Sequence, residues 1–157
     1  METADDPAFN DDFRDMLQAL IAEGAEFVVV GAHALAVHGV PRATGDIDLF
    51  VRPTRENAER VLRALFRFGA PISQHGLTIE DLESPGNVYQ IGVPPRRIDL
   101  LTSISGVDFE RAWSTKVMVQ RDGITLAVLD RDSLVANKRA SGRPKDLLDL
   151  ELLAEEE

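Results

Sequence analysis

Two aspartates lie two positions apart at the start of a short apolar segment. Asp46 and Asp48 alternate with Ile47 and with the apolar residues that follow. Because residues i and i+2 of a β-strand point to the same face, the two carboxylates would project together while the intervening side chains enter a core. Neighbouring carboxylates repel each other unless a cation lies between them, and Mg²⁺ and Mn²⁺ prefer hard oxygen ligands. The spacing therefore predicts a divalent-metal site on this strand.

A third carboxylate, Asp99, lies in a later apolar segment, residues 97–101. A carboxylate in such a strand costs free energy unless it has a partner. If this strand lies beside residues 46–51, Asp99 joins the first two and makes a cluster of three carboxylates. Such a cluster can bind two divalent metals and transfer a phosphoryl or nucleotidyl group.

Each carboxylate also has a simpler interpretation. Asp46 and Asp48 could cap or solvate the turn that precedes them. Asp99 could form a salt bridge with Arg96 or Arg97. These interactions can coexist with a metal site, so the sequence leaves both interpretations open.

Apolar periodicity and breaker residues mark the elements that would position these carboxylates. We expect helices over residues 9–24, 32–38, 54–69, 78–83, 108–114, 131–140 and 144–155. We expect strands over residues 27–30, 46–51, 88–93, 97–102, 117–120 and 124–129, the last two joined by a strong hairpin turn signal at Asp122-Gly123. This order predicts one α+β domain over residues 1–157. A mixed sheet within a core of residues 26–129 would be flanked by helices, with a helical pair over residues 131–155.

Composition limits the function classes. The chain has 157 residues, of which 44% are hydrophobic and 28% charged, as in ordinary globular domains. It has no apolar run long enough to span a membrane, no signal-peptide pattern and no cysteine for a disulfide or thiolate metal site; we therefore expect a cytoplasmic protein without membrane contact. The net charge of −10 argues against nucleic-acid binding through an overall basic surface. Basic clusters near residues 96–97 and 138–145 still allow a small anion or a short RNA.

The ordered set of motifs resembles a known superfamily. The set consists of Gly31 followed by a small residue, residues 41–48 (PRATGDID), residues 97–103 (RIDLLTS) and residues 142–149 (GRPKDLLD). It is similar to the nucleotidyltransferase superfamily, the polymerase-β-like fold, and within it to the bacterial AbiEii-like and minimal nucleotidyltransferase group. The resemblance covers most of the chain from Phe27 onward, and the ordered set is more specific than Asp-x-Asp alone.

The resemblance implies a role for each motif. The turn at Gly31 and Ala32 would let the backbone approach the phosphates of an NTP, with helix N–H groups behind it. Asp46 and Asp48 would hold Mg²⁺ or Mn²⁺ against the triphosphate, and Asp99 would complete one metal site and help deprotonate the attacking hydroxyl. NMP would then pass to that hydroxyl with release of pyrophosphate, mainly through positioning and charge neutralisation.

Basic and polar residues are further candidates for contact with the nucleotide. Arg42 and Thr44 would touch the phosphates or the acceptor, or they would stabilise the turn before the carboxylate strand. Lys138 and Lys145 would reach the β- and γ-phosphates. The alternative is a solvated helix end, in which Lys145 pairs with Asp149 at i+4.

One departure from the superfamily pattern concerns the glycine turn. Members usually have Gly-Gly or Gly-Ser where this chain has Gly31-Ala32. In the Gly-Ser members the serine hydroxyl is a phosphate ligand, which Ala32 cannot supply. The next residue, His33, would either line the nucleotide site or serve as a partly buried structural histidine.

Two function classes therefore compete. The first is a metal-dependent nucleotidyltransferase with an RNA, a protein or a small molecule as acceptor; relatives often serve in toxin–antitoxin or phage-defence pairs, which implies a cognate protein partner. The second is a catalytically inactive module of the same fold that acts through a protein partner, and Ala32 favours it. A metal-dependent phosphohydrolase would need water as the acceptor, which no residue pattern favours. The small size and the terminal helices are compatible with a homodimer.

Overall fold

The protein is built on one mixed sheet of six strands in a computed structural model that describes residues 9–155. The strands are β1 (Phe27–Val30), β2 (Asp46–Val51), β3 (Val88–Ile91), β4 (Arg97–Leu101), β5 (Val117–Arg121) and β6 (Ile124–Val128). Their order across the sheet is β3-β4-β2-β1-β6-β5. The pairs β2–β4 and β1–β6 are parallel, whereas β1–β2, β3–β4 and β5–β6 are antiparallel.

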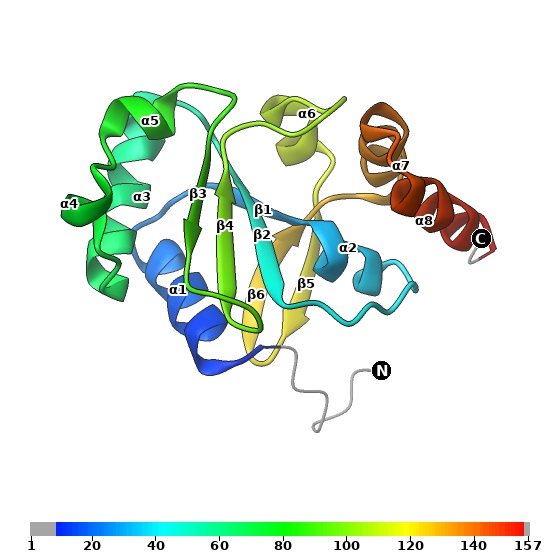
Figure 1. Cartoon of the computed structure of the whole chain (residues 1–157), viewed down its shortest axis with the longest axis horizontal. Coiled ribbons are helices and arrows are strands. Elements are labelled where there is room, and N and C mark those ends of the chain that lie inside the picture. The colour runs from blue at the N-terminus through cyan, green and yellow to red at the C-terminus, as the bar shows by residue number, and fades with distance from the viewer. Residues whose placement is uncertain (1–8, 156–157) are drawn as a thin grey trace.

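Helices surround this sheet. They are α1 (Asp11–Ala22), α2 (Gly31–Val37), α3 (Arg55–Phe68), α4 (Ile72–His75), α5 (Ile79–Glu83), α6 (Phe109–Ser114), α7 (Arg131–Ser141) and α8 (Pro144–Glu155). Helix α3 packs against α1 and α5, α2 packs on β1 and β2, and α7 packs on α8. Figure 1 shows α3, α4 and α5 at one end of the molecule, α7 and α8 at the opposite end, and the strands between them.

Side-chain caps explain where the main helices begin. The Thr54 hydroxyl accepts a hydrogen bond from the Asn57 N–H at the start of α3, and Asp130 does the same for the Ser133 N–H at the start of α7. Helix α3 ends at Gly69, which takes the left-handed conformation that terminates many helices. These local signals set the ends of elements whose apolar faces form the core.

The core lies between the sheet and its helices. The central strand β1 is buried along its whole length, and β2 alternates half-buried aspartates with fully buried Ile47 and Leu49 before ending in buried Phe50 and Val51. The alternation expected for residues 46–51 is therefore confirmed. It directs Asp46 and Asp48 to the same face of the sheet.

The expected α+β class, with a mixed sheet, flanking helices and a C-terminal helical pair, is confirmed. The short helix α4 was not predicted; it is one turn between Pro71 and Gly76, too short for any periodic pattern to reveal. Strand β3 stops at Ile91, short of the expected end at residue 93, because Gly92 turns the chain with a φ of +77°. Among residues 9–155, no helix is both long and apolar enough to cross a membrane.

Candidate active site

The three aspartates gather on two neighbouring strands. Strands β2 and β4 are parallel, with Asp48 directly opposite Asp99 and Asp46 opposite Arg97. One carboxylate oxygen from each aspartate lies within 4.8 Å of the others, so together they could hold a metal ion. The strand adjacency that the sequence analysis required for this cluster is therefore present.

Arg97 lies among these carboxylates. Its Nη2 donates to Asp46 Oδ2 and, over 3.3 Å, to Asp99 Oδ2. Its Nε lies 3.2 Å from Asp99 Oδ1. The salt bridge that the sequence offered as an alternative for Asp99 thus exists with Arg97, whereas Arg96 pairs with Asp12 on α1 at 3.3 Å.

Burial and repulsion between the carboxylates raise the pKa values of Asp48 and Asp99. Burial, reinforced by the charges of Asp46 and Asp99, raises the pKa of Asp48 to about 7. Burial also raises the pKa of Asp99, against the opposing charge of Arg97. Asp99 is only 6% exposed, and its Oδ1 has no hydrogen-bond partner among the described residues. The cluster therefore carries negative charge that its protein neighbours only partly neutralise.

Gly31 allows Asp48 its position. Gly31 has a φ of +69°, a conformation that residues with a side chain rarely adopt. A Cβ at Gly31 would collide with Asp48 Oδ2. The absence of a side chain at Gly31 therefore leaves room for the Asp48 carboxylate beside the turn at the end of β1.

Thr44 orients the first aspartate. Its hydroxyl donates to Asp46 Oδ1 over 2.9 Å and lies 3.1 Å from the Asp46 carbonyl oxygen. Thr44 therefore stabilises the turn before β2, which is one of the two roles that the sequence suggested for it.

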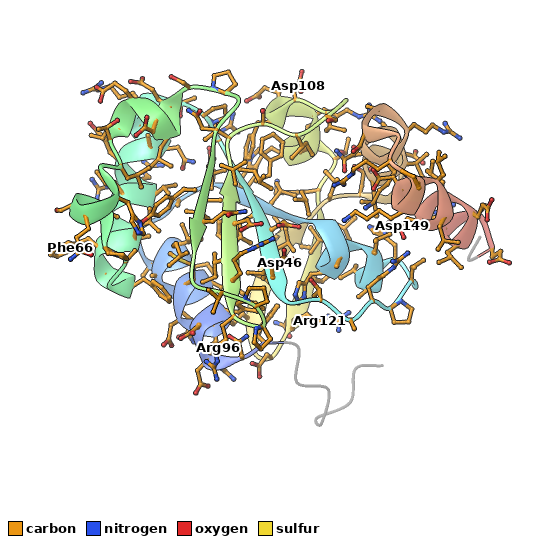
Figure 2. All side chains as sticks on the ribbon, viewed as in Figure 1. Asp46, Phe66, Arg96, Asp108, Arg121 and Asp149 are labelled. Atoms are coloured by element: carbon orange, nitrogen blue, oxygen red, sulfur yellow. The ribbon has the colours of Figure 1, made fainter. Side chains whose placement is uncertain are left out.

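A cleft of about 770 Å³ opens over the cluster. All nine residues that the sequence analysis placed in the catalytic, metal or nucleotide site line this cleft, namely Gly31, Ala32, Arg42, Thr44, Asp46, Asp48, Asp99, Lys138 and Lys145. The carboxylates come from the sheet, and the lysines come from α7 and α8. Figure 2 shows Asp46 near the centre of the molecule and Asp149 on the C-terminal helix α8.

A buried ion network ties the C-terminal helices to the loop before β2. Lys138 Nζ lies 3.1 Å from Asp149 and 3.4 Å from Asp146, and both carboxylates are almost completely buried. Asp149 also accepts a hydrogen bond from Arg42. Burial lowers the pKa of Lys138, against the charge of Asp146. Although its own burial opposes ionisation, hydrogen bonds from Arg143 hold the pKa of Asp146 well below its ordinary value.

This network corrects one alternative from the sequence analysis. Asp149 had been considered as a partner of Lys145, four residues earlier on the same helix. Its ion pairs within residues 9–155 are instead with Arg42 and Lys138. Both partners are distant in the sequence, so the i,i+4 spacing gave no sign of them.

Other cleft residues were not singled out by the sequence analysis. Ser103 and Asn137 line the cleft. Ser103 ends the motif of residues 97–103 but was given no role there, and Asn137 lies in no pattern with an evident chemical meaning. The sequence did contain a sign that Arg97 lies in the cleft. It is two positions before Asp99 on the same strand, so the two side chains point to the same face of the sheet. His33 lines a separate pocket of about 190 Å³, with its ring against Phe9 and Phe13.

The fold is that of the nucleotidyltransferase class. A family model described as "Nucleotidyl transferase AbiEii toxin, Type IV TA system" matches residues 14–157. The chain belongs to this AbiEii nucleotidyltransferase family.

A solved structure is also similar to the chain. It is the crystal structure of a proposed nucleotidyltransferase from Thermotoga maritima, with a TM-score of 0.59 and 16% sequence identity. The match covers 92% of this chain and 91% of the Thermotoga protein, so it supports the fold over nearly the whole length. Among curated proteins, none matches this chain significantly.

Proposed function

We propose that this protein transfers an NMP group from an NTP to a hydroxyl acceptor in a reaction that depends on Mg²⁺ or Mn²⁺. The observation that carries the proposal is the cluster of Asp46, Asp48 and Asp99 in the cleft of a chain of the AbiEii family. A hydroxyl on an RNA, on a protein or on a small molecule would serve as the acceptor.

The residues of the cluster fit a divalent metal. Three carboxylates supply hard oxygen ligands, and one oxygen of each lies within 4.8 Å of the others. Asp99 Oδ1 is buried without a hydrogen bond, and its contact is an ion pair with Arg97 Nε at 3.2 Å, which a metal could replace. We therefore assign the metal ligands to Asp46, Asp48 and Asp99. Bound there, the metal would neutralise the triphosphate and stabilise charge at the transferring phosphorus.

The proposed reaction is an in-line displacement at the α-phosphorus. The acceptor oxygen forms a bond to this phosphorus as the bond from it to the bridging oxygen breaks. Pyrophosphate leaves with the electron pair of that bond, and Asp99 helps to take the proton of the acceptor hydroxyl. The protein contributes mainly orientation and charge neutralisation.

We assign nucleotide contacts to both sides of the cleft. Gly31 and Ala32 would approach the phosphates through their backbone, and Arg42 and Thr44 through the loop before β2. Lys145 is exposed on α8, at the cleft wall, where it would meet the β- and γ-phosphates.

Lys138 would act in the same cleft with a weaker contribution. Asp146 and Asp149 already offset its charge within the buried network. We therefore expect Lys138 to affect nucleotide binding mainly indirectly, by stabilising the packing of α7 on α8 at the cleft wall.

The family suggests a protein partner. Because the matching family is a toxin of a toxin–antitoxin system, we propose a cognate antitoxin as partner, and the cytoplasm as the place of action. A second candidate function is a catalytically inactive module that acts through such a partner. Ala32 favours it, because it lacks the hydroxyl that related Gly-Ser turns use for phosphate.

Transfer of a labelled phosphate tests the proposal directly. Purified protein is incubated with Mg²⁺, cell lysate and each NTP labelled at the α-phosphate, in parallel with NTP labelled at the γ-phosphate. We expect the α-label, and not the γ-label, to appear on an RNA, protein or small-molecule product. Asp46→Asn should abolish the transfer because it removes a proposed metal ligand.

The two labels separate the competing reactions. Transfer of the γ-label would indicate phosphoryl transfer and contradict the proposal. No transfer of either label, together with Mg²⁺-dependent NTP binding, would favour the inactive module. Arg96→Gln, in the turn just before β4 and paired with Asp12 on α1, serves as a control that should keep full activity.

A further inference from the structure

The cluster of three aspartates includes a positively charged protein side chain, that of Arg97. Arg97 and the three aspartates lie on adjacent strands, and Arg97 is directly opposite Asp46 in the β2–β4 register. Its guanidinium contacts Asp46 Oδ2, Asp99 Oδ1 and Asp99 Oδ2. These oxygens belong to two of the three carboxylates that we assign to the metal.

The fit between Arg97 and Asp99 is imperfect. Arginine and a carboxylate bind most strongly through two parallel hydrogen bonds. Here Arg97 Nε lies 3.2 Å from Asp99 Oδ1, yet neither atom has a hydrogen-bond partner among the described residues. The other contact, from Nη2 to Asp99 Oδ2, is 3.3 Å long. Arg97 thus offsets the charge of Asp99 without saturating its oxygens.

The Arg97 side chain also has space to move away from the carboxylates into the cleft. Its side chain is 31% exposed and lines the cleft rather than the core. Within residues 9–155 its ion pairs are with Asp46 and Asp99, so no acidic residue outside the cluster anchors it in that part of the chain. A movement into the cleft would release both carboxylates without disturbing β4.

We propose that Arg97 is an internal counter-cation that competes with the divalent metal for Asp46 and Asp99, so that it sets the metal concentration at which the cluster fills. A divalent metal and the guanidinium would draw on the same two carboxylates, and their positive charges repel each other, so metal binding should weaken or displace the Arg97 contacts. In the metal-free protein, the same contacts relieve repulsion among three carboxylates. The inference rests on the proposed function, because it takes the cluster to be a metal site.

Opposite effects on metal affinity and on metal-free stability distinguish competition from a merely structural role. Removing the Arg97 charge should weaken the metal-free fold, because the carboxylates lose their counter-cation. It should also tighten metal binding, because the metal no longer displaces a competitor. A residue that only held the carboxylates in place would weaken both when removed.

The experiment measures Mn²⁺ binding and unfolding of the full chain. Binding is followed by loss of the electron paramagnetic resonance signal of free Mn²⁺, and unfolding is followed in urea with EDTA or with Mn²⁺. For Arg97→Gln we expect the Mn²⁺ dissociation constant to fall about tenfold, as expected for loss of a charge-assisted contact. The midpoint of unfolding should fall in EDTA and recover with Mn²⁺.

Three further variants sharpen the result. Arg97→Lys keeps the charge and should stay within about twofold of the wild type in Mn²⁺ affinity. Arg96→Gln removes the adjacent arginine, which pairs with Asp12 outside the cluster, and should change Mn²⁺ affinity equally little. Asp48→Asn, which leaves both Arg97 partners intact, tests whether Mn²⁺ binds at the cluster at all.

The outcomes separate the inference from the proposed function. If wild-type protein binds Mn²⁺ and Asp48→Asn does not, unchanged or weaker binding by Arg97→Gln overturns the role of Arg97 and leaves the metal site standing. If neither the wild type nor Arg97→Gln binds Mn²⁺, both proposals fail. If Arg97→Gln is unfolded in EDTA, recovery of folded protein on addition of Mn²⁺ supports the inference, and failure to recover contradicts it.

Discussion

At the residue scale, the three carboxylates have different surroundings although they share one cluster. Thr44 and Arg97 bind Asp46, whereas Asp99 is the most buried of the three. Asp48 lies against Gly31, at a point where any side chain on the neighbouring turn would collide with it. These differences predict separate effects when the residues are changed.

The pKa of Asp48 predicts a dependence of stability on pH. Burial and the charges of Asp46 and Asp99 raise this pKa from 3.8 to about 7. Between these values the folded protein retains a proton that the unfolded chain has lost, so stability is greatest below the unfolded pKa and falls as pH rises through the folded pKa. Urea unfolding in EDTA should show a loss on the order of 1–3 kcal/mol between about pH 4 and about pH 8.

Asp48→Asn is the control for this pH dependence. Asparagine keeps the shape of the side chain but does not ionise, so the slope of stability against pH should become shallower. An unchanged slope in the variant would assign the pH dependence to other groups.

Gly31→Ala should damage the site beyond the cost of its backbone conformation. Gly31 and Gly24 both have positive φ, but only a Cβ at Gly31 would meet Asp48, whereas a Cβ at Gly24 has open space. Each substitution should cost about 1–3 kcal/mol through backbone strain. Only Gly31→Ala should also weaken Mn²⁺ binding, which titration of both variants checks. Equal Mn²⁺ affinity in the two variants would show that the close approach of Gly31 to Asp48 does not affect metal binding.

At the scale of elements, the C-terminal helices are tied to the sheet by charge as well as by apolar packing. Lys138 on α7 meets Asp146 and Asp149 on α8, and Asp149 reaches Arg42 in the loop before β2. Asp149 keeps both of these ion-pair partners only when α7, α8 and this loop are all in place. The wall of the cleft and the strand that carries Asp46 are therefore coupled through one ion network.

Asp149→Asn should loosen this coupling. Removing one partner of a buried ion pair leaves the others with uncompensated charge, which costs about 3 kcal/mol in comparable cases. Urea unfolding measures the loss. Glu151→Gln makes the same chemical change at an exposed position of the same helix and should cost almost nothing. Equal losses in the two variants would show that the network adds little to stability.

At the scale of the whole molecule, the cleft joins opposite charges from distant parts of the chain. The acidic cluster comes from β2 and β4, and the basic wall comes from α7 and α8. A metal and a nucleotide together match this arrangement better than either does alone, because the metal meets the carboxylates and the phosphates meet the cations. Their binding should therefore be cooperative.

Thermal unfolding measures this cooperativity. Mn²⁺ with a non-hydrolysable NTP, each at about 100 times its dissociation constant, should raise the melting temperature by about 10–20 °C. Either ligand alone should give a smaller rise, and Asp48→Asn should reduce the combined effect. An NTP-induced rise that is the same with Mn²⁺ and with EDTA would show that the nucleotide binds independently of the metal.

Much of the fold could be predicted from local patterns. Alternation on residues 46–51 placed both aspartates on one face, the Asp122-Gly123 turn joined β5 to β6, and breakers marked most helix ends. These features depend on residues a few positions apart, whose geometry the backbone period determines. The domain boundaries over residues 1–157 and the roles of the candidate residues stay predictions.

Local sequence patterns were sufficient to assign residues to most strands and helices, and hence to show that two carboxylates share a face of β2. The pairing of β4 with β2, in the register that sets Asp99 opposite Asp48 and Arg97 opposite Asp46, became known from the three-dimensional structure. The same structure shows that Asp149 pairs with Arg42 and Lys138 rather than with Lys145. The difference lies in the separation along the sequence. Local periodicity orients side chains within one element, whereas strand pairing and the burial of charges depend on packing between segments far apart in the chain.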